Sequence, residues 1–388
     1  MLHRTPRTSP TRPTALCNTL GALSALLLAI TAGCTSTTQS EWRAYDEHDY
    51  VTALEESRPL ADRGNADAQF RLGLMYADGK GVEQNYADAA QWYRRAAEQG
   101  FAPAQVNLAL LYIEGHGVAK DMCEARSWLR LAADQGVMQA QYLLGSMYLH
   151  AHGVQQDHAE AAKWFKAAAD QHMAMAQADL GVMYARGQGV PRDDEKAVSL
   201  LRLAAEHGLP DAQTNLALMY AKGQGVSQDD GEAFAWTKRA ADQGFAIAQN
   251  KLGSMYAAGH GVTPNAEEAA RWMRLAADQG LAAAENNLGL MYVQENGVPK
   301  DEVEAARWFQ RAADQGLVVA QNRLAMMYAH GNGVSPDPVV AYMWYAIGAT
   351  QGDGSASLER DRLAQSMAPA QIEEAELRVR EWSESHSR

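Results

Sequence analysis

Cysteine is scarce in this chain of 388 residues, which contains only Cys17, Cys34 and Cys123. Two of the three fall within the first 34 positions, so the rest of the chain has one thiol and cannot form an internal disulfide. Basic residues are also in deficit, because 34 Lys and Arg face 47 Asp and Glu, a formal net charge of −13. This acidity argues against binding to nucleic acid or to anionic lipid through a polybasic surface.

The sequence also lacks the short motifs of common catalytic sites. Ser-x-x-Lys, Gly-x-Ser-x-Gly and His-Glu-x-x-His are all absent, and no glycine loop suited to cradling phosphate is found. His150, His152 and His158 cluster in one segment, but no spaced carboxylate or cysteine completes a metal site. We therefore expect no catalytic residue, no metal and no cofactor, and we interpret the histidine cluster as a solvated loop.

The chain has one long apolar run, and it lies near the amino terminus. Residues 1–14 are polar and basic, and residues 15–32 are apolar with small residues near their end, which is the layout of a secretory signal peptide. The run ends in Thr31-Ala32-Gly33-Cys34 and is followed by a polar segment. This ending resembles a bacterial lipobox, which implies a signal peptide over 1–33 and a lipidated Cys34 with a polar tether over 34–41.

The lipobox resemblance also implies a location. Thr35 follows the cysteine, in place of the aspartate that retains many such lipoproteins in the inner membrane. We expect the periplasmic side of the bacterial envelope, as an outer-membrane lipoprotein. An uncleaved membrane anchor and ordinary secretion are the alternatives.

A tyrosine recurs every 36 residues through the rest of the chain, at Tyr76, Tyr112, Tyr148, Tyr184, Tyr220, Tyr256, Tyr292 and Tyr328. Fixed self-similarity at such a period indicates a stacked array of supersecondary units. In the first unit, Ala68, Leu72 and Tyr76 share one face of a predicted helix, and Trp92 and Ala96 share a face of a second. Each unit is therefore expected to be a helix pair.

The remaining fixed positions agree with a helix pair. Gly79 and Gly81 can take the left-handed angles that end the first helix. The position after the repeated leucine contains only glycine or alanine, so the two helices can approach closely. The second helix has an amino-terminal capping residue in every unit: Asn85, Asp121, Asp157, Asp193, Asp229, Asn265, Asp301 and Asp337.

The pattern A-x-x-x-L-G-x-x-Y-x-x-G-x-G-V-x-x-D resembles the Sel1-like repeat, a relative of the tetratricopeptide repeat. The resemblance implies an all-α fold, an α/α superhelical solenoid of eight 36-residue helix-turn-helix repeats over 65–352. A capping helix over 42–64 and a helical cap over 353–388 are expected at the two ends. Ala151 and Glu295 replace the first loop glycine and His172 the closing one, so we expect local strain there in an unbroken array.

A partner should bind where the repeat leaves positions free to vary. In the related tetratricopeptide fold the first helices line the concave face, and the variable positions there form our candidate groove: Phe70, Arg71, Asn107, Tyr142, Asp179, Asn215, Asn250, Lys251, Asn286, Asn287, Asn322 and Arg323. The carboxyl-terminal members are amides and cations, and asparagine can hydrogen-bond an extended peptide backbone. The alternative is that these are simply solvated helix positions.

Members of the family that this chain resembles generally act as adaptors. We therefore expect no enzyme but a lipid-anchored envelope scaffold that binds a protein or peptide partner through this groove, meeting the membrane only through its lipid and binding no nucleic acid. One alternative is an envelope hydrolase acting on β-lactams or peptidoglycan, although the paired cysteines of relatives with such claims are missing. Another is a surface-exposed factor that meets host proteins.

Overall fold

The computed structural model describes residue 45 and residues 48–386, and throughout this part of the chain the regular secondary structure is α-helix. The predicted leader, Cys34, its tether and the first residues of the expected capping segment lie outside the described residues. The chain divides into two compact units, Met1–Arg192 and Asp193–Arg388.

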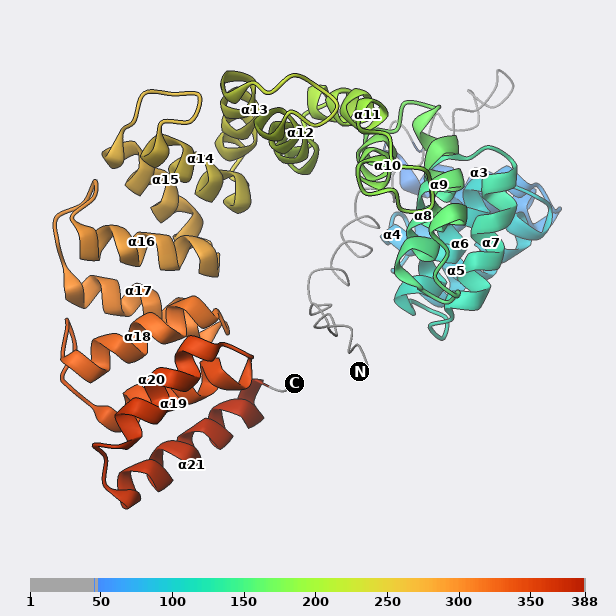
Figure 1. The fold of residues 1–388 in the computed structure, drawn as a ribbon. Helices are drawn as coiled ribbons and strands as arrows, with labels where there is room; N and C mark the ends of the chain where they lie inside the picture. The colour runs from blue at the N-terminus through green and yellow to red at the C-terminus, as the bar shows by residue number, and fades with distance from the viewer. Residues whose placement is uncertain (1–44, 46–47, 387–388) are drawn as a thin grey trace, which may run out of the picture. The chain divides into compact units, whose positions relative to one another are not determined.

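The amino-terminal unit consists of helix pairs of nearly constant length (Figure 1). Its helices are α3 (Tyr50–Asp62), α4 (Ala66–Asp78), α5 (Tyr86–Glu98), α6 (Ala102–Glu114), α7 (Met122–Asp134), α8 (Met138–His150), α9 (His158–Ala169) and α10 (Ala174–Arg186). The first helices α4, α6 and α8 each pack on the second helix of the same repeat, as α4 does on α5, and α5 packs in turn on α6, the first helix of the next repeat.

The carboxyl-terminal unit continues this arrangement and ends with two further helices. It contains α11 (Asp194–Glu206), α12 (Pro210–Lys222), α13 (Asp230–Asp242), α14 (Ala246–Ala258), α15 (Ala266–Asp278), α16 (Ala282–Gln294), α17 (Glu302–Asp314), α18 (Val318–His330), α19 (Pro338–Thr350), α20 (Gly354–Ala364) and α21 (Pro369–His386). Both α20 and α21 pack on α19. The predicted all-α array of repeated helix pairs is thereby confirmed.

The predicted second-helix caps are all present. In α7, for example, the Asp121 carboxylate accepts hydrogen bonds from the backbone N–H groups of Cys123 at 2.8 Å and Glu124 at 3.0 Å. Such a cap contributes about 1 kcal/mol to helix stability. The first helices from α6 onward begin instead after an apolar residue without a side-chain cap, such as Phe101 before α6. Their position therefore depends on packing more than on local capping.

Three loop positions have a residue other than the usual glycine, and the helix pairs around them are intact. Ala151, His172 and Glu295 adopt φ values of 60°, 67° and 56°, in the left-handed region that glycine occupies in the other repeats. A side chain in this region is strained. The neighbouring helices keep their 36-residue register, except that α9 ends one residue early, at Ala169 before His172, so the strain at these three sites is local.

The small residue of the first helix makes room for a bulky residue of the second helix. A Cβ atom added at Gly145 would lie 2.8 Å from the Phe165 ring, and one at Gly289 would lie 2.7 Å from the Phe309 ring. Both distances are shorter than a normal van der Waals contact. The close approach of the helices that the sequence predicts is therefore filled by an aromatic side chain.

A buried glutamine amide connects three successive helices at the junction between repeats, a role that the sequence analysis did not identify. Gln105 donates to the Ala97 carbonyl oxygen at 3.1 Å and accepts from Gln135 Nε2 at 2.9 Å. We call this arrangement the glutamine clamp, and its buried members are Gln69, Gln105, Gln141, Gln213, Gln249 and Gln321. A glutamine at a 36-residue interval was the only signal in the sequence.

Glu285 replaces the clamp glutamine in the seventh repeat. Its side chain is buried, with one carboxylate oxygen 2.9 Å from Arg311 Nε and the other accepting from Gln315 Nε2 at 2.7 Å. Burial raises the pKa of the Glu285 carboxyl above its ordinary value, although Arg311 and Gln315 act in the opposite direction. The charged form is therefore disfavoured in the folded state.

The helix contact at Gly145 can be tested by substitution. Gly145→Ala should lower the free energy of unfolding by about 1–3 kcal/mol, because the added methyl group overlaps the Phe165 ring. Urea denaturation followed by circular dichroism measures the change. Gly354→Ala is the control, since a Cβ there meets no atom within 4 Å. Replacing Phe165 by leucine in the Gly145→Ala variant should recover part of the loss, and an unchanged urea midpoint in Gly145→Ala would contradict this account.

The buried carboxyl of Glu285 predicts a pH-dependent stability. Because its folded-state pKa is raised, the native state gains stability relative to the unfolded chain as the pH falls through the raised pKa toward the ordinary value of 4.5. Glu285→Gln should therefore raise the urea midpoint at pH 7, and the advantage should shrink on acidification. The converse variant Gln321→Glu should lose stability at pH 7. In that repeat the residue equivalent to Arg311 is Ile347, which cannot pair with the buried carboxylate. A pH-independent difference would refute the explanation.

Candidate functional site

Six of the predicted groove residues lie on the first helices α14, α16 and α18, and three of their amides form a hydrogen-bonded series. Arg323 Nη1 donates to Asn286 Oδ1, Asn286 Nδ2 donates to Asn287 Oδ1 at 3.4 Å, and Asn287 Nδ2 donates to Asn250 Oδ1 at 3.0 Å. We call the set Asn250, Lys251, Asn286, Asn287, Asn322 and Arg323 the amide strip. It runs across three repeats because positions 36 or 37 residues apart are neighbours in the array.

The two ends of the amide strip are cationic. Lys251 is exposed and Arg323 is half-buried. Burial lowers the pKa of the Arg323 guanidinium from its ordinary value. Within the described part of the chain Arg323 forms no ion pair, whereas Arg71 at the equivalent position of the first repeat lies 2.5 Å from Asp67. The acid is missing in the eighth repeat because Val319 occupies the position of Asp67.

An apolar pocket adjoins the Arg323 end of the strip. It is lined by Leu290, Val293, Glu302, Phe309, Arg323, Met326, Met327 and Asn332. The guanidinium carbon of Arg323 lies 5.8 Å from the centroid of the Phe309 ring, so the cation lies over the aromatic wall of the pocket. Val293 and Met326 are 37 % and 47 % exposed, which leaves apolar surface available to another molecule.

The amino-terminal members of the candidate groove have different surroundings. Phe70, Arg71, Asn107 and Tyr142 are buried. The Phe70 ring packs against Tyr93 and Phe101, with ring centroids 5.7 and 5.4 Å apart. These four side chains thus do not form the open surface that the sequence analysis expected, because aromatic and apolar neighbours in the first three repeats enclose them.

Two predicted residues, Asp179 and Asn215, remain between these two groups. Asp179 accepts a hydrogen bond from the Tyr142 hydroxyl at 3.0 Å, and burial raises the pKa of that hydroxyl. Asn215 is half-buried on α12, one repeat before the amide strip. The structure therefore brings together the carboxyl-terminal half of the predicted groove, while the role of every member in partner binding stays a prediction.

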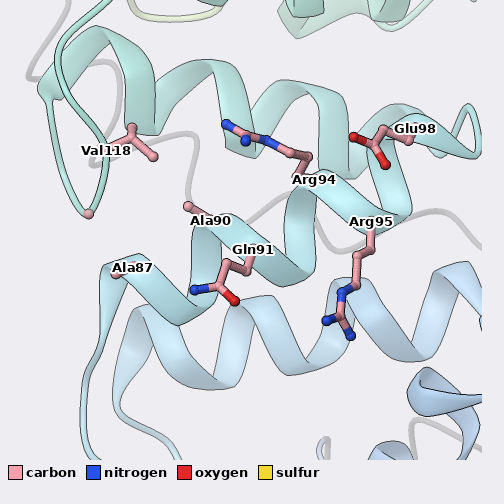
Figure 2. A pocket seen from close by; sticks show the side chains of 8 residues that line it. Ala87, Ala90, Gln91, Arg94, Arg95, Glu98 and Val118 are labelled. Carbon is pink, nitrogen blue, oxygen red and sulfur yellow. The ribbon is translucent and has the colours of Figure 1, made fainter.

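A second pocket, on α5 and the loop that follows α6, is lined by Arg94, Arg95 and Glu98 together with Gln91 and small or apolar residues (Figure 2). Arg94 and Arg95 extend from α5 in different directions. Arg94 donates to the Tyr112 hydroxyl, and the Arg95 guanidinium lies 4.5 Å from the centroid of the Trp92 ring. Arg94 thus connects α5 to α6, Arg95 contacts an aromatic ring of its own helix, and the amide strip is the stronger candidate for partner binding.

The histidine cluster is less solvated than expected. His150, His152 and His158 are half-buried, and burial is the main cause of the lowered pKa of His150 and His152. Across the described residues, no group of three His, Cys, Asp or Glu side chains is placed to hold a metal ion. A search of the same residues for a helix long and apolar enough to cross a bilayer finds none.

Comparison with known proteins identifies the repeat. The family model of the Sel1 repeat matches residues 66–101, 102–137, 139–173, 174–209, 210–245, 246–281, 282–317 and 318–353. No curated protein matches the chain.

Two solved structures are similar over most of the chain. A Sel1 repeat protein from Oxalobacter formigenes is 35 % identical with a TM-score of 0.65, and the match covers 88 % of this chain and 99 % of that one. A protective antigen present in uropathogenic Escherichia coli strains, which displays an SLR fold, is 30 % identical with a TM-score of 0.50 and a coverage of 94 % of both chains.

Proposed function

Because the chain belongs to the Sel1 repeat family, whose members generally mediate protein–protein interactions, we propose that it is a lipid-anchored scaffold of the bacterial cell envelope. It holds a protein or peptide partner against the face formed by its first helices. The observation that carries this proposal is the amide strip, in which polar groups from three repeats line one continuous path. Sel1 repeat proteins are generally non-catalytic scaffolds, which agrees with this role.

The chemistry of the amide strip suits an extended polypeptide. Each asparagine offers one acceptor oxygen and two N–H donors, so an amide that is bonded to its neighbour keeps capacity for another partner. An extended segment presents alternating backbone donors and acceptors along its length. Each of the helices α14, α16 and α18 contributes at least one asparagine to the strip. An extended segment can therefore lie across all three helices.

The membrane anchor rests on the amino-terminal sequence. The segment Thr31-Ala32-Gly33-Cys34 follows an apolar run and precedes a polar one, as in a lipoprotein signal. Lipid on Cys34 tethers the array at the envelope surface, and the tether leaves the repeats accessible to a partner.

A second candidate function is supported by one comparison. The similarity to a protective antigen of uropathogenic Escherichia coli favours exposure on the cell surface, where the repeats meet host proteins. Protease treatment of intact cells separates the two locations, because only a surface-exposed chain is cleaved. Assays of nitrocefin hydrolysis and muropeptide turnover test the alternative of an envelope hydrolase.

Lipid attachment is tested at the proposed cysteine. Cys34→Ala should abolish incorporation of a fatty-acid label and prevent removal of the leader, since the acyl chains attach to the Cys34 thiol and the proposed cleavage site precedes this residue. Metabolic labelling and mass spectrometry of the purified protein measure the two effects. Cys17→Ala is the matched control, because Cys17 lies within the predicted leader. Persistent labelling of the Cys34→Ala protein would exclude Cys34 as the lipid site.

The role of the strip is tested on a partner identified by crosslinking in intact cells and mass spectrometry. Replacing Asn250, Asn286 and Asn287 with alanine should weaken binding of that partner roughly tenfold or more, because about 0.5–1.5 kcal/mol is lost for each hydrogen bond. Isothermal titration measures the affinity. Alanine at Gln91 and Gln155, which are exposed amides elsewhere, is the control. An unchanged affinity in the triple variant would place the partner on another surface.

A further inference from the structure

The first helices of the last three repeats have a charge opposite to that of the whole chain. The formal net charge is −13, yet α14, α16 and α18 together contain one acidic residue, Glu285. That carboxylate is buried against Arg311 and is not presented to the surface. Lys251 and Arg323 are therefore the charged side chains that these three helices offer to a partner, and both attract anionic groups.

Both cations have an apolar residue where a counter-ion could stand. One helical turn before Lys251 is Ile247, and one turn before Arg323 is Val319, with exposures of 54 % and 48 %. In the first repeat the same position is Asp67, which pairs with Arg71. Half-burial of the Arg323 guanidinium without a carboxylate carries a desolvation cost that an incoming carboxylate would offset.

The pocket beside Arg323 adds a requirement for an apolar group. Leu290, Val293 and Met326 present apolar surface next to the guanidinium. Glu302 also lines the pocket, but its carboxylate lies 2.9 Å from Lys300 Nζ, so this acid is paired. A ligand that fits must therefore contain a carboxylate and an apolar side chain close together.

We propose that the amide strip recognises an acidic, extended segment of a partner protein, in which an Asp or Glu side chain binds Arg323 and an apolar side chain enters the pocket of Leu290, Val293 and Met326. The two side chains stand two positions apart in the segment, because alternate residues of an extended chain point to the same side. Asn287 and Asn250, which are half-buried, bind its backbone, while the buried Asn286 accepts from Arg323 and positions that cation. This inference rests on the proposed scaffold function and specifies the chemistry of the partner.

Selection from a displayed library of random seven-residue peptides tests the proposal. The peptides are flanked on both sides, so that their only carboxylates are those of side chains. The selected peptides should be enriched in Asp or Glu two positions from Leu, Ile, Met or Phe. For the best synthetic peptide, Arg323→Gln and Val319→Asp should each weaken the affinity by about tenfold or more, the first by removing the cation and the second by supplying an internal counter-ion.

Arg307→Gln is the matched control, because it removes one positive charge from an exposed side chain of α17 and should leave the affinity unchanged. Circular dichroism verifies that each variant is folded. Selected peptides without an excess of acid, no selection at all, or equal affinities for wild type and Arg323→Gln would each overturn the proposal.

Crosslinking in cells separates this inference from the scaffold function. If wild type and Arg323→Gln capture the same partners equally well, the scaffold function stands and the acidic-segment inference fails. If the wild-type protein captures no partner, the scaffold function itself fails.

Discussion

The packing of each repeat on the next is the constraint on which the array depends, and a buried glutamine clamp reinforces it in six of the eight repeats. A single helix pair has too little apolar surface for a core of its own, so each repeat must be fixed to the next. The buried amide of Gln105 meets this need because one side chain bonds the end of the preceding helix and the end of its own repeat's second helix. A buried amide must satisfy both its donor and its acceptor, so it also fixes the register between neighbouring repeats.

The same register creates the candidate site. Once successive first helices are held in register, residues 36 or 37 positions apart become neighbours, as in the hydrogen bond between Asn287 and Asn250. A binding surface on such an array therefore forms where successive repeats have the same residue type at equivalent positions. Its length is set by the number of successive repeats that share that residue type. In this chain the shared type is asparagine with a cation at either end, and it extends over α14, α16 and α18.

The array is regular in its backbone and varied in its side chains. Phe70 in the first repeat packs against Tyr93 and Phe101, whereas the equivalent Asn322 and its neighbour Arg323 in the eighth repeat remain partly exposed. The cation at the next position shows the same contrast, because Arg71 is neutralised by Asp67 and Arg323 is not. Equivalent positions of different repeats thus differ in their capacity to bind a partner. Asn322 and Arg323 in the last repeat remain partly accessible, whereas Phe70 and Arg71 in the first repeat do not.

The sequence by itself determined the helix pairs, the second-helix caps and the close approach at Gly145, because these depend on local periodicity and backbone conformation. It also placed Asn250, Asn286, Asn287 and Arg323 in one strip, since a constant period makes them neighbours. Only the tertiary structure decided that Phe70, Asn107 and Asn286 are buried, that a glutamine connects most repeats, and that Arg323 lies beside an apolar pocket without forming an ion pair within the described residues. Burial and pairing depend on what packs against a side chain from other helices, and the residue type alone does not contain that information.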